Sequence, residues 1–372
     1  MVHIEDKKDC CGCGGCAQIC PRQCIQMKAD REGFLYPSAD RKQCIACGLC
    51  EKVCPVAHAD ARNAKPISAR LVAYAAYVLN ETIREKSSSG GIFSLLAEQE
   101  IRCGGVVFGA AMDEDGRGVH HIAVETIGDL ELLRGSKYLQ SRMGNCFLQV
   151  RTLLKEGRRV LFSGTACQIA GLKEFLGPLR DNNALMTVDV LCHGVPSDKV
   201  WKAELRNLRA KYGRSVEKVS FRAKQTGWKK FSLYIRFSNG REYLRTHDED
   251  AFMRLFLANI CLRPSCHACC FKELSRPSDL TLGDCWGVDR VMPEMDDDRG
   301  TSVVLVHTKK GEAMWNQVKS QCCAVSADVD TILPPDSDSR KSVIPHRNRK
   351  KLFRLLNIWG GYRRQPVFCC SC

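Results

Sequence analysis

The stretch CCGCGGCAQICP at residues 10–21 is followed by a similar stretch, CIACGLCEKVCP, at residues 44–55. Each contains C-x2-C-x2-C-x3-C-P, the spacing that binds iron–sulfur cubanes in bacterial proteins with two clusters. Three cysteines two residues apart can enclose one corner of a cubane, and the glycines between them permit tight backbone turns. The fourth cysteine, which precedes a proline, ligates the other cluster. The two stretches therefore predict a small α+β module with two [4Fe-4S] clusters.

This crossover assigns four cysteines to each cluster. One set is Cys10, Cys13, Cys16 and Cys54, and the other is Cys44, Cys47, Cys50 and Cys20. Structural zinc is the alternative, because zinc ligands also come in C-x2-C pairs, but zinc sites normally use four ligands in two pairs. Cys11 and Cys24 lie outside the pattern, and we expect them to be unligated thiols. Residues 1–62 have little apolar core, so the clusters themselves should stabilise this module.

Composition and charge narrow the class of protein. The 372 residues suffice for two or three domains, and 44% hydrophobic with 26% charged residues is typical of a globular chain. No apolar run approaches the roughly 20 residues of a membrane helix, and the N-terminus lacks the apolar core of a secretory signal, which predicts a cytoplasmic protein. In that reducing compartment, 24 cysteines indicate metal or redox sites rather than disulfides. The net charge of +14 favours an acidic or anionic partner without selecting one.

The remaining chain alternates strand-like and helix-like segments, which predicts a larger mixed α/β domain. We expect strands at 69–80, 105–112, 119–125, 158–164, 184–194, 216–224, 231–240, 241–247, 279–284 and 302–308. We expect helices at 87–105, 143–157, 167–177, 197–213, 249–259 and 312–321. This domain divides into 66–155 and 156–335. A basic tail at 336–372 follows, and although residues 350–359 could form an amphipathic helix, we expect the tail to be solvated.

Two loop-to-helix junctions resemble anion-binding sites. SSSGG at 87–91 and VLFSGTACQ at 160–168 each place small residues where a helix begins, and helix N-termini favour anions. A serine N-cap is the simpler interpretation of the first, and neither junction contains G-x-G-x-x-G or Walker A. Beside a redox module, the two junctions favour a nucleotide-type cofactor. Flavin fits best, because it exchanges single electrons with a cluster and a hydride with an organic substrate.

A further cysteine-rich region, CLRPSCHACC, occupies residues 261–270. Cys266 and Cys269 form a C-x2-C pair, which needs two more thiolates to bind a cubane. Cys167 and Cys192 are candidates, because both follow apolar strands and a parallel sheet would bring them to one edge. Each alone is more often an inert buried thiol. The other residues considered are Cys261 and Cys270 as alternates, Cys285 as a neighbour of the site, Cys103 and Cys146 as core residues, and His193 and His267 as structural histidines.

The order of these motifs resembles a known family. After the two N-terminal runs come SSSGG, RGSKYLQS, VLFSGTACQIAGLK, DVLCHGVPS, LRPSCHACCFK and SDLTLGDCWGV. From residue 10 to about 320 the chain is similar to the coenzyme F-420 hydrogenase/dehydrogenase beta-subunit family, which includes 7-hydroxymethyl chlorophyll a reductase-like proteins. The resemblance implies a core that binds FAD and an adjacent iron–sulfur cluster. It also implies a hydride-carrying substrate, such as the deazaflavin coenzyme F-420.

The resemblance also implies particular residues. The FAD contacts would be Ser88, Ser89, Gly90, Gly91, Lys137, Tyr138, Gly164, Thr165 and Gln168. The ligands of a third, flavin-proximal cluster would be Cys167, Cys192, Cys266 and Cys269. The chain departs from the family at Ala166, where a proline is usual, so the turn there should be less rigid.

Together these features predict a cytoplasmic iron–sulfur flavoprotein oxidoreductase with a redox protein partner (ferredoxin, hydrogenase or dehydrogenase subunit) and a small-molecule hydride acceptor. Two alternatives remain open: a non-catalytic electron-transfer subunit of a larger complex, and a zinc-stabilised protein that binds nucleic acid. The second conflicts with the lack of any recognised nucleic-acid motif. The sequence assigns no catalytic acid or base and leaves a homo-oligomer open.

Overall fold

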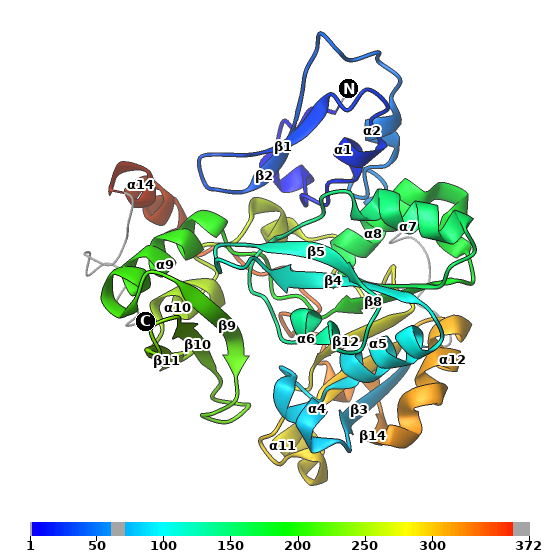
Figure 1. The fold of residues 1–372 in the computed structure, drawn as a ribbon, viewed down its shortest axis with the longest axis vertical. Coiled ribbons are helices and arrows are strands. Elements are labelled where there is room, and N and C mark those ends of the chain that lie inside the picture. Colours follow the sequence, from blue (N-terminus) through cyan, green and yellow to red (C-terminus); the bar gives the residue numbers. More distant parts are fainter. Residues whose placement is uncertain (1, 61–70, 360–372) are drawn as a thin grey trace.

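The computed structural model describes residues 2–60 and 71–359. Residues 2–60 form a small module at one end of the molecule (Figure 1). Its secondary structure consists of η1 (Lys7–Asp9), α1 (Gly15–Ile19), β1 (Ile25–Ala29), β2 (Leu35–Ala39) and α2 (Leu49–Lys52). The two short helices start directly after Gly14 and Gly48, whose φ angles of 75° and 73° favour glycine. The predicted α+β module is thus confirmed.

A nine-stranded mixed sheet forms the centre of the described part of the chain, in the order β14-β3-β13-β12-β8-β7-β4-β5-β6. Its strands are β3 (Val72–Val78), β4 (Val106–Met112), β5 (Val119–Val124), β6 (Ser141–Arg142), β7 (Val160–Thr165), β8 (Leu185–Val190), β12 (Leu280–Asp284), β13 (Ser302–Val306) and β14 (Cys322–Ala327). The four neighbours β12, β8, β7 and β4 run parallel. Their carboxyl ends therefore meet at one edge of the sheet, which is where such sheets form ligand sites.

Helices cover both faces of this sheet. One core contains Leu95 and Leu96 of α5 (Ile92–Arg102) and Trp315 of α12 (Lys309–Val318). The other contains Phe147 of α7 (Cys146–Lys155) and Ile169 of α8 (Ala166–Leu176). The shorter helices are α4 (Glu81–Lys86), α6 (Leu130–Leu133), α11 (Val288–Val291), α13 (Val329–Ile332), η2 (Gly177–Asp181), η3 (Pro264–Ala268), η4 (Pro293–Met295) and η5 (Lys319–Gln321). Within the described ranges, every helix is too short or too polar to cross a membrane.

A separate antiparallel sheet extends from this core, with the strand order β11-β10-β9. Its strands are β9 (Val216–Ala223), β10 (Ser232–Phe237) and β11 (Glu242–Thr246), and two helices, α9 (Asp198–Tyr212) and α10 (Ala251–Leu257), pack with them. Trp201, Phe221 and Phe252 are fully buried between them. The described elements confirm the mixed α/β fold class.

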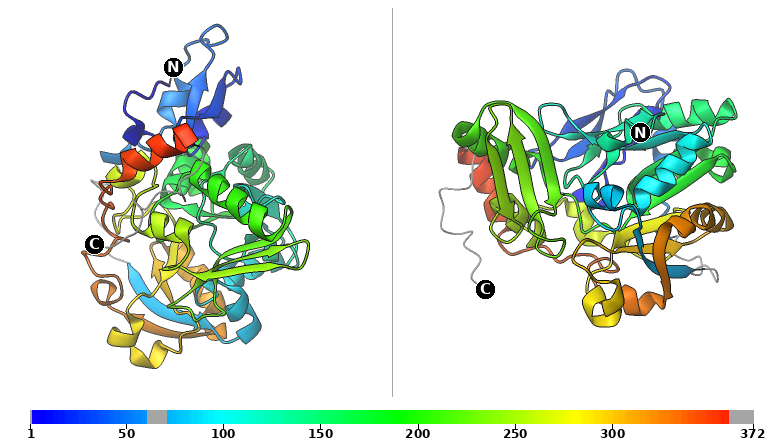
Figure 2. Two further views of the ribbon diagram at one scale, coloured as in Figure 1. Left: turned by 90° about the vertical axis from the view of Figure 1, so that its left-hand side faces the viewer. Right: turned by 60° about the horizontal axis from the view of Figure 1, so that its bottom comes forward.

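The C-terminal basic segment differs from its prediction. Residues 349–359 form helix α14, which buries Leu352, Phe353 and Leu356 in the same core as Trp201. Figure 2 shows this helix lying against the N-terminal module. The expectation of a solvated tail is therefore wrong for this helix, because its apolar face has a hydrophobic surface to cover. Residues 360–372 lie outside the described residues.

Two smaller expectations also need correction. α5 begins at Ile92, and its N-cap is Gly91 rather than a serine, with no side-chain capping bond. Cys103 is exposed, because it lies at the C-terminal end of α5. By contrast, Cys146 is buried as expected, with its Sγ 3.4 Å from the carbonyl oxygen of His121.

Candidate redox site

The first N-terminal thiol set lies next to the large domain. Burial raises the pKa of the Cys16 thiol to about 12, and the nearby thiols of Cys10 and Cys54 contribute to the rise. The fourth member, Cys13, packs on helix α8, where a side chain at Gly171 would come within 2.8 Å of Cys13 Sγ. The fold thus brings Cys10, Cys16 and Cys54 close to one another and places Cys13 on the side of the module that faces α8.

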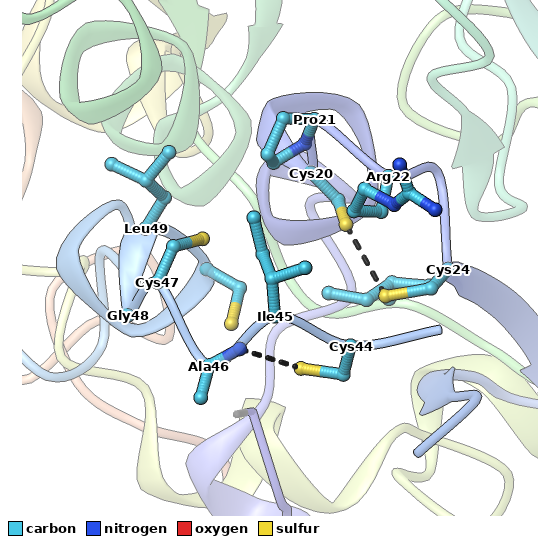
Figure 3. Close-up of a pocket in the computed structure, with 12 residues that line it drawn as sticks. Cys20, Pro21, Arg22, Cys24, Cys44, Ile45, Ala46, Cys47, Gly48 and Leu49 are labelled. Carbon is cyan, nitrogen blue, oxygen red and sulfur yellow. Dashed lines mark hydrogen bonds between the residues drawn. The ribbon is translucent and has the colours of Figure 1, made fainter. Parts of the chain in front are cut away.

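The second set surrounds a cavity of about 340 Å³ that includes some open solvent (Figure 3). Cys20, Cys44, Cys47 and Cys50 all line it. The backbone N–H of Ala46 lies 3.4 Å from Cys44 Sγ, and that of Val2 lies 3.3 Å from Cys50 Sγ. Amide donors of this kind suit thiolate ligands, because they stabilise negative charge on sulfur.

Cys24 lies in the same cavity, although its sequence position predicted an unligated thiol. Its Sγ lies 3.4 Å from Cys20 Sγ, a contact that Figure 3 marks. Within residues 2–60 and 71–359, no three side chains of His, Cys, Asp or Glu converge on one point as ligands of a single metal ion. A cubane is bound at separate corners, so its cysteines surround a volume rather than one point.

A third group of thiols lies where β7 and β8 end. Cys167 is in the first turn of α8, Cys192 follows β8, and Cys266 belongs to η3. With Cys269 they line one pocket of about 610 Å³, partly open to solvent, so all four predicted ligands meet. Burial raises the pKa of the Cys192 thiol to about 12. Four cationic residues, Lys8, Arg263, Lys272 and Arg276, also line this pocket and can offset the negative charge of thiolates.

Four other cysteines lie either at this pocket or in a hydrophobic core. Cys11 and Cys270 line the third thiol pocket, and Cys11 contacts both Cys13 and Cys167 through its sulfur. Cys261 and Cys285 are fully buried in two hydrophobic cores away from it. Sequence spacing had offered Cys261 and Cys270 as equal alternates, and the fold places only Cys270 at the pocket.

A large cleft adjoins this pocket, with about 1580 Å³ of empty space, part of it open to solvent. Eight of the nine predicted FAD-contacting residues line it: Ser88, Ser89, Gly91, Lys137, Tyr138, Gly164, Thr165 and Gln168. Gly90 lies behind the wall, where its N–H donates to Ser302 Oγ at 3.0 Å and its carbonyl oxygen accepts from the Val78 N–H at 2.8 Å. Gly90 therefore shapes the loop and does not line the cleft.

The cleft suits a long anionic cofactor. Its wall is rich in serine and glycine, which supply hydroxyl and backbone donors close to a ligand. Among the described residues of this wall, one is acidic: Asp284, which is paired with the Arg222 guanidinium at 3.0 and 3.1 Å. A side chain at Gly164 would meet Gln168 Oε1 at 3.0 Å, so the close approach of the chain here favours glycine. This donor set fits the phosphates of FAD.

Three of the residues predicted to contact FAD also form hydrogen bonds within the protein. The Thr165 N–H donates to Gln168 Oε1 at 2.9 Å, and the two residues form a capping box at the start of α8. The Lys137 ammonium donates to the carbonyl oxygens of Leu132 at 3.0 Å and Arg134 at 2.8 Å. Burial lowers the pKa of Lys137 to about 7.

Comparisons with known proteins match two parts of the chain. Residues 157–331 match the family model for the C terminus of the coenzyme F420 hydrogenase/dehydrogenase beta subunit, and residues 9–58 match a 4Fe-4S dicluster domain. The first match covers a little under half of the chain, and over those residues the chain is similar to the C-terminal part of this beta-subunit family. A comparison with curated proteins found no match. Among solved structures, a chain of the xenon-derivatised F420-reducing [NiFe] hydrogenase complex from Methanosarcina barkeri is 18% identical, with a TM-score of 0.47 over 72% of this chain and 84% of that one.

Two residues at the cleft, His121 and Arg222, were not predicted from the sequence. His121 lies in the cleft wall, where its Nε2 donates to the Ser163 carbonyl oxygen at 2.9 Å and its Nδ1 accepts from Ser141 Oγ at 2.6 Å. Burial lowers the pKa of His121 to about 4, so the ring is neutral. Arg222 lies in a strand with no recognisable motif. Only the fold brings His121 into the cleft wall and Arg222 next to Asp284 of that wall.

Proposed function

We propose that this chain transfers electrons between a one-electron carrier protein and a hydride-accepting organic substrate or coenzyme. In this proposal, the N-terminal module exchanges electrons with the carrier. Cys167, Cys192, Cys266 and Cys269 hold a third [4Fe-4S] cluster, and the adjacent cleft holds FAD. The carrier would be a ferredoxin or a hydrogenase or dehydrogenase subunit. The substrate is a small hydride acceptor such as a deazaflavin.

One observation supports this function above the others: the third thiol pocket and the cleft share a wall. The shared residues are Cys11, Thr165, Cys167, Cys192, His193, Gly194 and Val195. Two cofactors that exchange electrons have to lie close together, and a shared wall satisfies that requirement. A zinc-stabilised nucleic-acid-binding protein would not need such a cleft.

The chemistry of the cleft is divided between cofactor and protein. When bound, FAD supplies the exchange between single electrons and a hydride. The chain itself lines the cleft with Ser88, Ser89 and Lys137, and the Ser89 hydroxyl donates to the Thr301 carbonyl oxygen at 3.0 Å. The Arg222 guanidinium donates to the Ser88 carbonyl oxygen at 3.4 Å, and the Lys224 ammonium donates to the Ser89 carbonyl oxygen at 3.4 Å. These two cations hold the serine loop against the sheet.

Catalysis by the isolated chain tests this function. Anaerobically purified holoprotein, reduced with dithionite in the absence of any other protein, should release FAD on denaturation and should reduce a deazaflavin or nicotinamide acceptor. Protein from which flavin has been removed is the control and should be inactive. Turnover that requires a second protein, with flavin present, would instead assign the chain to a non-catalytic electron-transfer role.

A further inference from the structure

Arg263 joins the N-terminal module to the loop that carries the third thiol set. It precedes η3 in the sequence, two residues before Ser265 and three before Cys266. Only 1% of its surface is exposed. Sequence reasoning gave this arginine no role, although it lies inside the motif LRPSCHACC.

The guanidinium of Arg263 contacts the first cluster-binding loop at several atoms. Nε donates to the Cys10 carbonyl oxygen at 2.9 Å, and Nη2 donates to the Leu35 carbonyl oxygen at 2.9 Å. Nη2 also lies 3.6 Å from Cys10 Sγ, which is hydrogen-bond distance for sulfur. On the other side, Nη1 donates to Gln140 Oε1 at 2.9 Å. The planar group stacks over Tyr36, 4.3 Å from the ring centroid.

These contacts do not pair the positive charge with a carboxylate. All the acceptors named above are uncharged oxygens or the Cys10 sulfur, and arginine stays protonated in proteins. A buried charge is costly unless an opposite charge compensates for it. A cluster bound at Cys10 can do so, because four thiolates and four sulfides outweigh the charge of the iron. Arg263 also lines the third thiol pocket, but its hydrogen bond to sulfur is the one to Cys10. Hydrogen bonds to sulfur and nearby charge are two of the factors that set a cluster's reduction potential.

We propose that Arg263 is a positioning residue that raises the reduction potential of the cluster held by Cys10, Cys13, Cys16 and Cys54. This inference rests on the proposed function for the identity of that cluster. A cation beside the cluster favours its reduced form, which carries one more electron and is more negative. The same side chain fixes the cluster loop against the loop of Cys266. Electrons entering the module are therefore drawn toward the thiol set nearer the cleft.

The second thiol set provides the comparison. Arg22 lines its cavity but is exposed, so water and salt screen its charge. Arg263 is buried, where the same charge acts more strongly. Replacing Arg22 should therefore change the potential of the neighbouring cluster far less than replacing Arg263 changes that of the first cluster.

The experiment is an anaerobic redox titration of the full-length holoprotein, monitored by electron paramagnetic resonance. R263Q should shift the midpoint potential of one N-terminal cluster to lower values and leave the other unchanged, with the iron content of the wild type. R263K should shift the same potential less, because it keeps the charge. R22Q should shift the potential of the second cluster far less than R263Q shifts that of the first.

A merely structural role predicts a different pattern. Gln140 Nε2 donates to the carbonyl oxygens of Cys11 and Gly12, both at 3.2 Å, so Q140L disturbs the same junction without removing a charge. Equal shifts in Q140L and R263Q would overturn the proposal. Unchanged potentials in R263Q, or loss of that cluster from both R263Q and R263K, would also overturn it. Two intact clusters with unchanged potentials would refute only the role of Arg263, whereas a wild type without cubanes would refute the proposed function itself.

Discussion

At the residue scale, Lys137 is the side chain of the cleft whose charge depends most on pH near neutrality. Its pKa is lowered to about 7 by burial, so its amine is protonated below that pH and mostly neutral above it. An ammonium attracts the phosphates of a flavin dinucleotide, whereas a neutral amine does not. Cofactor affinity should therefore be highest below about pH 7 and should weaken as pH rises.

The variant K137M tests this dependence. Loss of a hydrogen bond to a charged group costs about 1.5–3 kcal/mol, so K137M should bind FAD roughly tenfold to a hundredfold more weakly at pH 6. At pH 9 the two proteins should differ much less, because the wild-type amine is then neutral. Fluorescence titration of the flavin-free protein at both pH values measures this. Equal affinities at pH 6 would contradict a contact between Lys137 and FAD.

The spacing of residues in the sequence predicts which side chains group together when those residues are close neighbours in the chain. Cys44, Cys47 and Cys50 belong to one tight loop, so their grouping follows from the chain itself. Cys24 and Arg263 are different, because their contacts with Cys20 and Cys10 depend on how the chain folds back. No spacing rule contains that information.

At the element scale, periodicity predicted most strands and helices of the sheet, including β7, α8 and β8, whose ends carry the site. It did not predict how α14 packs, because an amphipathic basic helix has the same sequence pattern whether it lies in solvent or on a core. In the structure, Arg349 pairs with Glu32 of the N-terminal module, with Nη1 3.0 Å from Oε1. Phe353 packs against Phe34 with ring centroids 6.1 Å apart.

The packing of α14 predicts that F353A is strongly destabilised. Phe353 is 3% exposed, and truncating a buried phenylalanine costs about 3–5 kcal/mol. The midpoint for thermal loss of the iron–sulfur absorbance should fall by several degrees under anaerobic conditions. Ile358 lies on the same helix but is 64% exposed, so I358A should match the wild type. Equal midpoints for F353A and I358A would show that this helix does not stabilise the module.

At the scale of the whole molecule, the third thiol pocket and the large cleft share a wall, and the N-terminal module contributes Cys11 to it. The sequence predicted the members of all three thiol sets, through local motifs for two of them and through family resemblance for the third. It did not predict the shared wall between pocket and cleft, because that wall combines Cys11 of the module with the ends of β7 and β8. The parallel order of β12, β8, β7 and β4 creates this arrangement.

Iron and sulfide analysis of anaerobically purified wild type and Cys167→Ser is the most direct test of a third cluster in this chain. Three cubanes correspond to about twelve irons and twelve sulfides per chain, and loss of one leaves about eight of each. We predict the first value for the wild type and the second for the variant, with the spectra of the N-terminal clusters unchanged. A variant that retains all the iron of the wild type, or a wild type with only about eight irons, would contradict a third cluster at Cys167.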